Sequence, residues 1–199
     1  MTPGPPNGSS HGEHQREYYQ AWHHPNLEPR VETPYLRRHL EASLRAAGLE
    51  PAGAPSGPPA TVALGNWFHR PRVLEIGCGA GRYTLLLAAR GIAVEGLDVA
   101  PNLLARLRSH APPGSELPLH CADLESPSRS LDGAFDVVLG YFVLHHLGNL
   151  DICLQSVARL LKPGGRAVFV EPNPWNALYY LQIAVTPSMT WGGSAASPT

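Results

Sequence analysis

Three carboxylates and three glycines in this 199-residue chain stand at spacings that could bind a nucleotide-like ligand. They are Glu75, Asp98 and Asp123, with Gly77, Gly79 and Gly81 shortly after the first acid. Each acid lies within or just after a short apolar run, which places it at the end of an expected strand. Such carboxylates can accept hydrogen bonds from ammonium or ribose hydroxyl groups, and glycines let a ligand approach the main chain. The pattern therefore predicts one polar site built from several strand ends.

Alternating strands and helices are expected to position these residues. Apolar runs predict strands at 73–76, 93–97, 117–121, 135–139 and 167–170. Helical periodicity follows three of them, over 82–90, from Pro101 onward and after Asn149. This order indicates an α/β fold, a Rossmann-like doubly wound and mostly parallel sheet. Such sheets bind ligands at the carboxyl ends of their strands.

The glycine spacing distinguishes two kinds of nucleotide-binding corner. A dinucleotide-binding fingerprint would need a glycine at position 82, where this chain has Arg82. Glu75 followed by the three glycines instead resembles the first motif of the class I S-adenosylmethionine (SAM)-dependent methyltransferases. Asp123 with its neighbour, and the Lys-Pro-Gly-Gly turn at 162–165, resemble later segments of the same family. The resemblance covers residues 71 to about 180 and is closest to the small-molecule (type 11/12-like) methyltransferase domains.

This resemblance implies SAM as the cofactor, together with a set of residues that bind it. The glycine turn would pass under the amino-acid part of SAM, and Glu75 would help to hold its ammonium group. Asp98 would accept the ribose hydroxyls, a role that the ribose of NAD would fit equally well. Asp123 would bind the adenine amino group, although an aspartate after a strand is also a common turn former. Three residues complete the expected cofactor-binding set beside Leu124: Cys78, Val99 and Tyr141.

Two adjacent histidines after the fourth expected strand are candidates for a catalytic base. A sulfonium methyl is already activated, so the protein mainly positions the reactants and excludes water. A base is needed only where the acceptor must lose a proton. His146 is expected to face the pocket and act as that base, whereas Leu-flanked His145 is expected to pack. Glu171, at the end of the fifth strand, is the alternative base.

The expected function is methyl transfer from SAM to an O, N or C atom of a small molecule. The family's sheet has seven strands, and this chain offers five, so we expect the last two strands to be absent. The fifth strand, 167–170, would then be an apolar sheet edge that favours self-association. The alternative is a SAM-binding module with little or no activity, and an NAD-dependent oxidoreductase is a third reading that Arg82 disfavours.

Composition divides the chain into four expected parts. Residues 1–17 are expected to be a disordered tail, because they carry almost no apolar side chains. Residues 18–50 are expected to form a helical lid segment, with a helix that begins at Thr33-Pro34 and ends at Gly48. Residues 51–70 are a Pro- and Gly-rich linker or insertion. Residues 71–199 form the SAM-binding core, which looks C-terminally truncated.

Charge and cysteine usage limit the expected partners. The net charge of −1 gives no electrostatic basis for binding nucleic acid or an anionic membrane surface. No apolar run approaches the length of a membrane span. The three cysteines show neither metal-site nor disulfide spacing, so we expect no metal and a cytoplasmic location. The expected partner is a small-molecule methyl acceptor.

Overall fold

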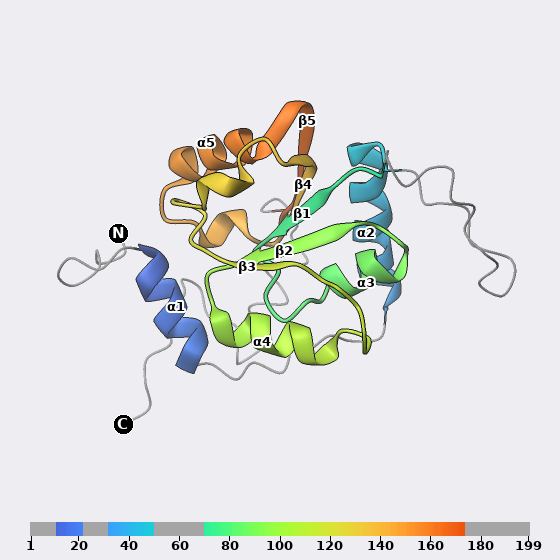
Figure 1. The fold of residues 1–199 in the computed structure, drawn as a ribbon, viewed down its shortest axis with the longest axis horizontal. Helices are drawn as coiled ribbons and strands as arrows, with labels where there is room; N and C mark the ends of the chain where they lie inside the picture. The colour runs from blue at the N-terminus through green and yellow to red at the C-terminus, as the bar shows by residue number, and fades with distance from the viewer. Residues whose placement is uncertain (1–10, 22–31, 50–69, 174–199) are drawn as a thin grey trace, which may run out of the picture.

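The computed structural model describes residues 11–21, 32–49 and 70–173 (Figure 1). Five parallel strands form one sheet in the order β3-β2-β1-β4-β5. The strands are β1 (Val73–Ile76), β2 (Val94–Asp98), β3 (Leu119–Cys121), β4 (Phe135–Tyr141) and β5 (Leu161–Val170). The helices are α1 (His11–Ala21), α2 (Pro34–Ala47), α3 (Thr84–Ala89), α4 (Pro101–His110) and α5 (Leu150–Leu160). The predicted α/β class and parallel sheet are confirmed.

The strand order creates a crevice beside β1. From β1 the chain runs outward through β2 to β3, then returns to β4 on the other side of β1. The connections that leave β1 and β4 run in opposite directions. A crevice therefore opens between them at the carboxyl ends of these two strands. The sheet therefore presents the glycine turn after β1 at the place where open α/β sheets bind ligands.

The strand ends agree with the prediction to within a few residues, except in β5. This strand begins at Leu161, which pairs with Phe135, whereas the next paired positions are Arg166 and Val137. The predicted turn at 162–165 therefore bulges out of the strand rather than preceding it. Gly164 has a φ of 81°, a left-handed conformation that glycine adopts without strain.

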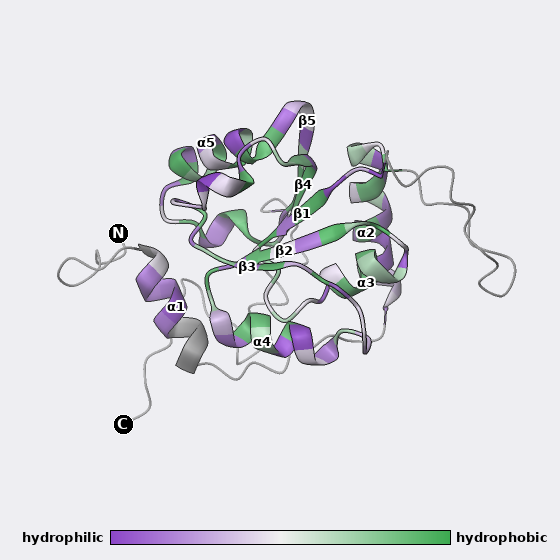
Figure 2. Cartoon of the chain, in the orientation of Figure 1, coloured by the Kyte–Doolittle hydropathy of each residue, from purple (hydrophilic) through white to green (hydrophobic). Residues whose placement is uncertain are grey.

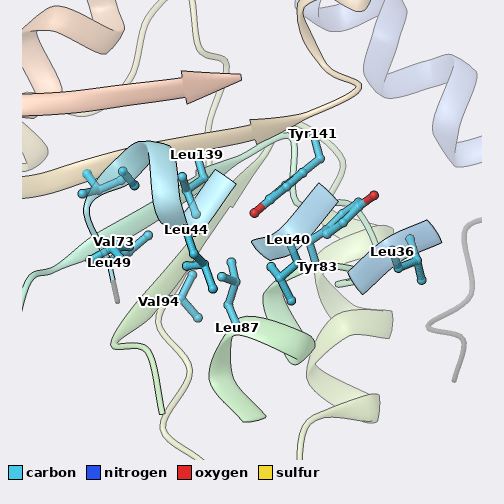
Figure 3. Packing of buried hydrophobic residues seen from close by; sticks show 12 residues of the cluster. Leu36, Leu40, Leu44, Leu49, Val73, Tyr83, Leu87, Val94, Leu139 and Tyr141 are labelled. Carbon is cyan, nitrogen blue, oxygen red and sulfur yellow. The ribbon is translucent and has the colours of Figure 1, made fainter. Parts of the chain in front are cut away.

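Helices α2, α3 and α4 cover one face of the sheet (Figure 1). Helix α2 packs against β5, and its leucines Leu40 and Leu44 belong to a buried cluster that also contains Val73 of β1 and Val94 of β2 (Figure 3). Its ends are those predicted: the Thr33 side chain accepts a hydrogen bond from the Leu36 amide, and left-handed Gly48 follows its last residue. Helix α2 therefore anchors the N-terminal segment to the core.

Helix α5 covers the other face of the sheet. Cys153, Val157 and Leu160 of this helix form a buried cluster with Leu74 and Val138 of the central strands. The central strands are largely hydrophobic, whereas the coloured part of α1 is largely hydrophilic (Figure 2). The core thus lies in two layers on either side of β1 and β4, and α1 contributes little to it.

Helix α1 differs from the sequence prediction. The expected disordered tail over 1–17 is wrong for residues 11–17, which are helical, and residues 1–10 lie outside the described residues. The helix has no apolar face, because it is charged and polar along most of its length, so hydrophobic periodicity could not reveal it. The linker at 51–69 and the segment from 174 onward also lie outside the described residues. Among the helices described, none combines the length and apolarity needed to cross a membrane.

Candidate active site

The predicted residues converge on one cavity of about 290 Å³ at the carboxyl edge of the sheet. This volume is near the lower end of the range for small-molecule pockets, which begins at about 300 Å³. The cavity lies where β1, β2 and β4 end, and the first turn of α1 helps to close it. Ten predicted site residues line it: Glu75, Gly77, Cys78, Gly79, Asp98, Val99, Asp123, Leu124, Tyr141 and His146. Gly81 is absent from this lining.

The three glycines of the turn differ in what surrounds them. All three have positive φ values, of 65°, 52° and 91° in chain order. A Cβ on Gly77 would collide with the Val143 side chain, and one on Gly81 would collide with Leu107. A Cβ on Gly79 would meet only Leu103 Cδ1, at 4.0 Å. The first and third glycines therefore make room for neighbouring side chains, and Gly79 leaves its backbone open to the cavity.

Asp98 joins the glycine turn to the end of β2. Its Oδ2 accepts a hydrogen bond from the Gly79 amide, and its Oδ1 accepts one from the Ala100 amide, both at 2.8 Å. The side chain is buried, and this burial raises the pKa of the carboxyl although the two backbone amides oppose the rise. A carboxylate has about four lone-pair sites. Asp98 therefore retains acceptor capacity for a ligand in the cavity.

Glu75 is a buried acid beneath the glycine turn. It is 2% exposed, and its carboxyl accepts a hydrogen bond of 2.6 Å from the Thr84 hydroxyl in α3. Burial raises the pKa of Glu75 to about 8, the Thr84 hydrogen bond opposes the rise, and the Asp98 charge adds to it. The acid is therefore mainly protonated at neutral pH. A ligand cation beside it would favour the carboxylate form.

Helix α1 closes the end of the cavity that contains Asp123. The Arg16 Nε donates a hydrogen bond of 3.2 Å to the Val99 carbonyl. Gly12 lies so close to Asp123 that a Cβ at this position would collide with Oδ2 of the carboxylate. The other oxygen of Asp123 accepts a hydrogen bond of 2.9 Å from the Glu125 amide. The contribution of Gly12 to the cavity was missed, since the sequence carries no signal that would find it.

Two stacked tyrosines form an aromatic wall of the cavity. The rings of Tyr83 and Tyr141 are parallel to within 7°, with centroids 3.8 Å apart (Figure 3). The Tyr141 hydroxyl is 2.6 Å from the Ser43 hydroxyl of α2, and the Tyr83 hydroxyl is 3.4 Å from His39 Nδ1 of the same helix. Burial raises the pKa of both phenols. Helix α2 therefore fixes this wall, and both phenols stay protonated at neutral pH.

Phe142 follows Tyr141 in an unusual backbone conformation. Its φ is 54°, the only positive φ of a non-glycine residue in the described segments. A bulky residue in this region is strained, and such residues gather at functional sites. The Phe142 amide donates a hydrogen bond of 2.8 Å to the Val170 carbonyl, and the residue belongs to the cavity lining. The Phe142 ring lies edge-on to the His39 ring of α2, with centroids 5.5 Å apart, an arrangement that no sequence pattern predicted.

Glu171 fixes the histidine turn that follows. Its Oε1 accepts hydrogen bonds of 2.8 Å from the Val143 and Leu144 amides, and its Oε2 lies 2.7 Å from His145 Nδ1. The 3₁₀ turn over Leu144–His146 is therefore held at its first residues by the end of β5. His146 lines the cavity with an exposed side chain, whereas His145 pairs with Glu171. In the described segments, no group of three or more His, Cys, Asp or Glu residues could hold a metal ion.

Known sequences match the part of the chain that builds this cavity. A family profile described as a methyltransferase domain matches residues 74–169. A ubiquinone biosynthesis O-methyltransferase of Idiomarina loihiensis is 33% identical over 103 residues, which cover 51% of this chain and 42% of that protein. A demethylmenaquinone methyltransferase of Tropheryma whipplei is 35% identical over 113 residues, covering 54% of this chain and 46% of that protein. The chain spans less than half the length of these curated relatives.

Solved structures agree in fold. A protein of Pyrococcus horikoshii aligns with a TM-score of 0.58 and 22% identity, over 83% of this chain and 66% of that one. A SAM-dependent methyltransferase of Archaeoglobus fulgidus aligns with a TM-score of 0.50 and 20% identity, over 78% of this chain and 62% of that one. Residues 74–169 thus match the methyltransferase-domain family, and the two solved structures share the fold of this chain.

Proposed function

We propose that this chain is an enzyme that transfers a methyl group from SAM to an O, N or C atom of a small molecule. The observation that carries the proposal is the convergence of Glu75, Asp98 and Asp123 with the open backbone of Gly79 on one cavity. The cavity lies at the strand-order reversal, where ligands bind in open α/β sheets. The same residues lie within the segment that matches the methyltransferase family profile.

The residues of the cavity fit the chemical groups of SAM. The unused lone pairs of Asp98 suit the ribose hydroxyls, and Asp123 with the backbone of Leu124 suits the adenine edge. Glu75, a buried acid with a raised pKa, would be stabilised in its charged form by the ammonium group. Gly79 leaves room for the ligand to lie against the main chain. When bound, SAM supplies an activated methyl group on its sulfonium.

The other side of the cavity suits an uncharged, apolar acceptor. Phe142 and Leu147 line it beside the stacked wall of Tyr83 and Tyr141. These side chains would exclude water and hold the acceptor in line with the methyl group. Positioning of this kind can supply several kcal/mol, up to about 10, of the barrier reduction.

His146 is the residue that we propose as a base for hydroxyl acceptors. Its side chain lines the cavity, and the turn that carries it is fixed through Glu171. A neutral imidazole can serve as a general base, so it could take the acceptor proton as the methyl group arrives. Glu171 is a weaker candidate, because both of its oxygens already accept hydrogen bonds or pair with His145.

A methyl-transfer assay tests the proposal directly. The purified chain would be incubated with methyl-labelled SAM and a panel of phenols, amines and activated carbon acids. We expect label in at least one acceptor class, and loss of that transfer in Gly79→Val, which places bulk on the cavity side. SAM binding without transfer to any acceptor would instead favour a binding module, an alternative that we do not propose because the relatives are named methyltransferases.

Two further expectations belong to this proposal. The proposed partner is a small-molecule acceptor, and a cytoplasmic location stays a prediction. Strand β5 pairs only with β4 within the described part of the sheet, so its other edge remains a candidate for self-association. All of its residues are half-buried or exposed, and α2 packs against it.

A further inference from the structure

A second cavity, the amino-edge cavity, lies at the edge of the sheet opposite the candidate active site. It opens between the last residues of α3 and α4 and the first residues of β2 and β3, and its volume is about 480 Å³. Most of the residues that line it are small or aliphatic, among them Leu85, Ala88, Ala89, Ile92, Ala93 and Leu117. Small-molecule sites in proteins have volumes of about 300–1,000 Å³. The amino-edge cavity is therefore large enough for a ligand of its own.

Backbone contacts hold the walls of the amino-edge cavity in place. In the loop over 111–118, the Ser115 amide donates a hydrogen bond of 3.0 Å to the Pro112 carbonyl. The same loop is tied to β2, because the Gly96 amide donates a hydrogen bond of 3.0 Å to the Pro118 carbonyl. On the α3 side, the lining includes alanines such as Ala88, whose side chains are too short to fill the space. The shape of the cavity is therefore built into the fold.

A buried hydrophobic cluster lies between the two cavities. Cys78, Leu104 and Leu107 form this cluster, and Leu85 and Leu117 pack against it. Cys78 lines the active-site cavity, whereas Leu85 and Leu117 line the amino-edge cavity. A ligand in the amino-edge cavity would therefore leave the candidate active site unobstructed.

The polar groups of the lining disfavour a buried anion. None of the described residues in this lining is a lysine or an arginine. The Glu95 carboxylate already accepts a hydrogen bond from Arg72 and lies 2.8 Å from His120 Nε2. The remaining polar residues of the lining are exposed: His110, Ser115 and Glu116. Because a negative charge buried without a partner is costly, the cavity suits a neutral ligand.

We propose that the amino-edge cavity binds a neutral, mainly apolar molecule the size of one aromatic ring or two fused rings. Its aliphatic walls would remove the apolar surface of such a ligand from water, and apolar cavities in proteins do take up small aromatic molecules. An α-helix with its side chains is about 10–12 Å wide, which excludes a helical segment of a partner from a space of this volume. The site is separate from the proposed methyl transfer and does not depend on it.

Alanine methyl groups allow one experiment to locate the ligand. The full chain with isotope-labelled alanine methyl groups would be titrated with indole, a neutral ring compound, and followed by NMR. Ala88, Ala89 and Ala93 line the amino-edge cavity, whereas Ala80 and Ala122 line the active-site cavity. We expect saturable shifts of the first three methyl signals and no comparable shifts of the other two. Indole carboxylate, which adds one negative charge, should bind at least about tenfold more weakly.

A cavity-filling variant and its matched control complete the test. Ala89→Leu places a larger side chain at the cavity and should weaken indole binding about tenfold or more, because overpacking is costly. Ala105→Leu makes the same change at an exposed alanine of α4 outside both linings, and it should bind indole like the parent. Shifts confined to Ala80 and Ala122 would place indole in the active site and overturn the proposal. The absence of saturable shifts, equal affinity for indole carboxylate, or unchanged binding in Ala89→Leu would overturn it as well.

Discussion

Replacing Glu75 with glutamine should stabilise the chain, and increasingly so as the pH rises. The folded protein raises the pKa of Glu75 from 4.5 to about 8, chiefly through burial. The folded state therefore binds this proton more tightly than the unfolded state does. Below the unfolded pKa, Glu75 is protonated in both states and does not affect the free energy of unfolding. As the pH rises from the unfolded pKa to the folded pKa, that free energy falls, and above the folded pKa it is lowered by the full cost of burying the ionised carboxylate. Glutamine resembles the protonated acid in shape and removes this titration.

The size of the effect follows from the pKa shift. A rise from 4.5 to about 8 corresponds to about 5 kcal/mol at roughly 1.4 kcal/mol per pKa unit. Integrated over pH, the stability difference between Glu75→Gln and the parent should grow by about 3 kcal/mol from about pH 5.5 to about pH 8.5. The Thr84 hydroxyl can donate to the glutamine carbonyl as it does to the acid, so that hydrogen bond need not be lost.

Urea unfolding followed by circular dichroism measures the free energy of unfolding of Glu75→Gln and of the parent at each pH. Both proteins share all other titrating groups, so their difference isolates Glu75. Glu116→Gln is the matched control, because Glu116 is exposed and lies away from the cavity lining. It reports what the removal of an exposed carboxylate alone does to the measured stability. A flat difference for Glu75→Gln, or one that falls with pH, would refute the reasoning, because Glu75 would then fold as an ordinary carboxylate.

Three further predictions follow from the same geometry. Gly81→Ala should destabilise the fold by about 1–3 kcal/mol more than Gly79→Ala in urea unfolding, because only its Cβ would collide with Leu107; equal losses would contradict this. His146→Ala should lower kcat for a hydroxyl acceptor and leave the SAM affinity within about twofold of the parent. Loss of SAM affinity instead would make His146 structural. Light scattering should show mass rising with protein concentration through pairing at the β5 edge, and a monomer throughout would count against it.

The central part of the fold could be read from local patterns. The apolar run at 73–76 and the glycines after it predict a strand followed by a tight turn. Asp98 comes directly after the next apolar run, which predicts its place at a strand end. Thr33 and Gly48 likewise marked both ends of α2, because caps depend on a few neighbouring residues. The parallel sheet and the convergence of the predicted residues on one cavity edge follow from these local features.

Features that depend on distant contacts could not be predicted. Glu171 fixes amides that lie 27 and 28 residues earlier in the chain, and no spacing indicates such a pair. The different surroundings of Gly77, Gly79 and Gly81 arise from Val143, Leu103 and Leu107, which the fold brings to them. The described side chains of α1, over residues 12–17, form no apolar stripe, and no sequence spacing indicates the hydrogen bond from Arg16 to the Val99 carbonyl.

The central claim is that the cavity binds SAM through its strand-end carboxylates. Isothermal titration of the parent and Asp98→Ala with SAM and with NAD tests it most directly. We predict one SAM site per chain, no NAD binding, and a loss in Asp98→Ala of about 2–3 kcal/mol from a charge-assisted hydrogen-bond pair. Urea unfolding of Asp98→Ala controls for loss of the turn, because Asp98 accepts hydrogen bonds from the Gly79 and Ala100 amides. Binding of NAD in place of SAM, or equal SAM affinity in the parent and Asp98→Ala, would contradict the account.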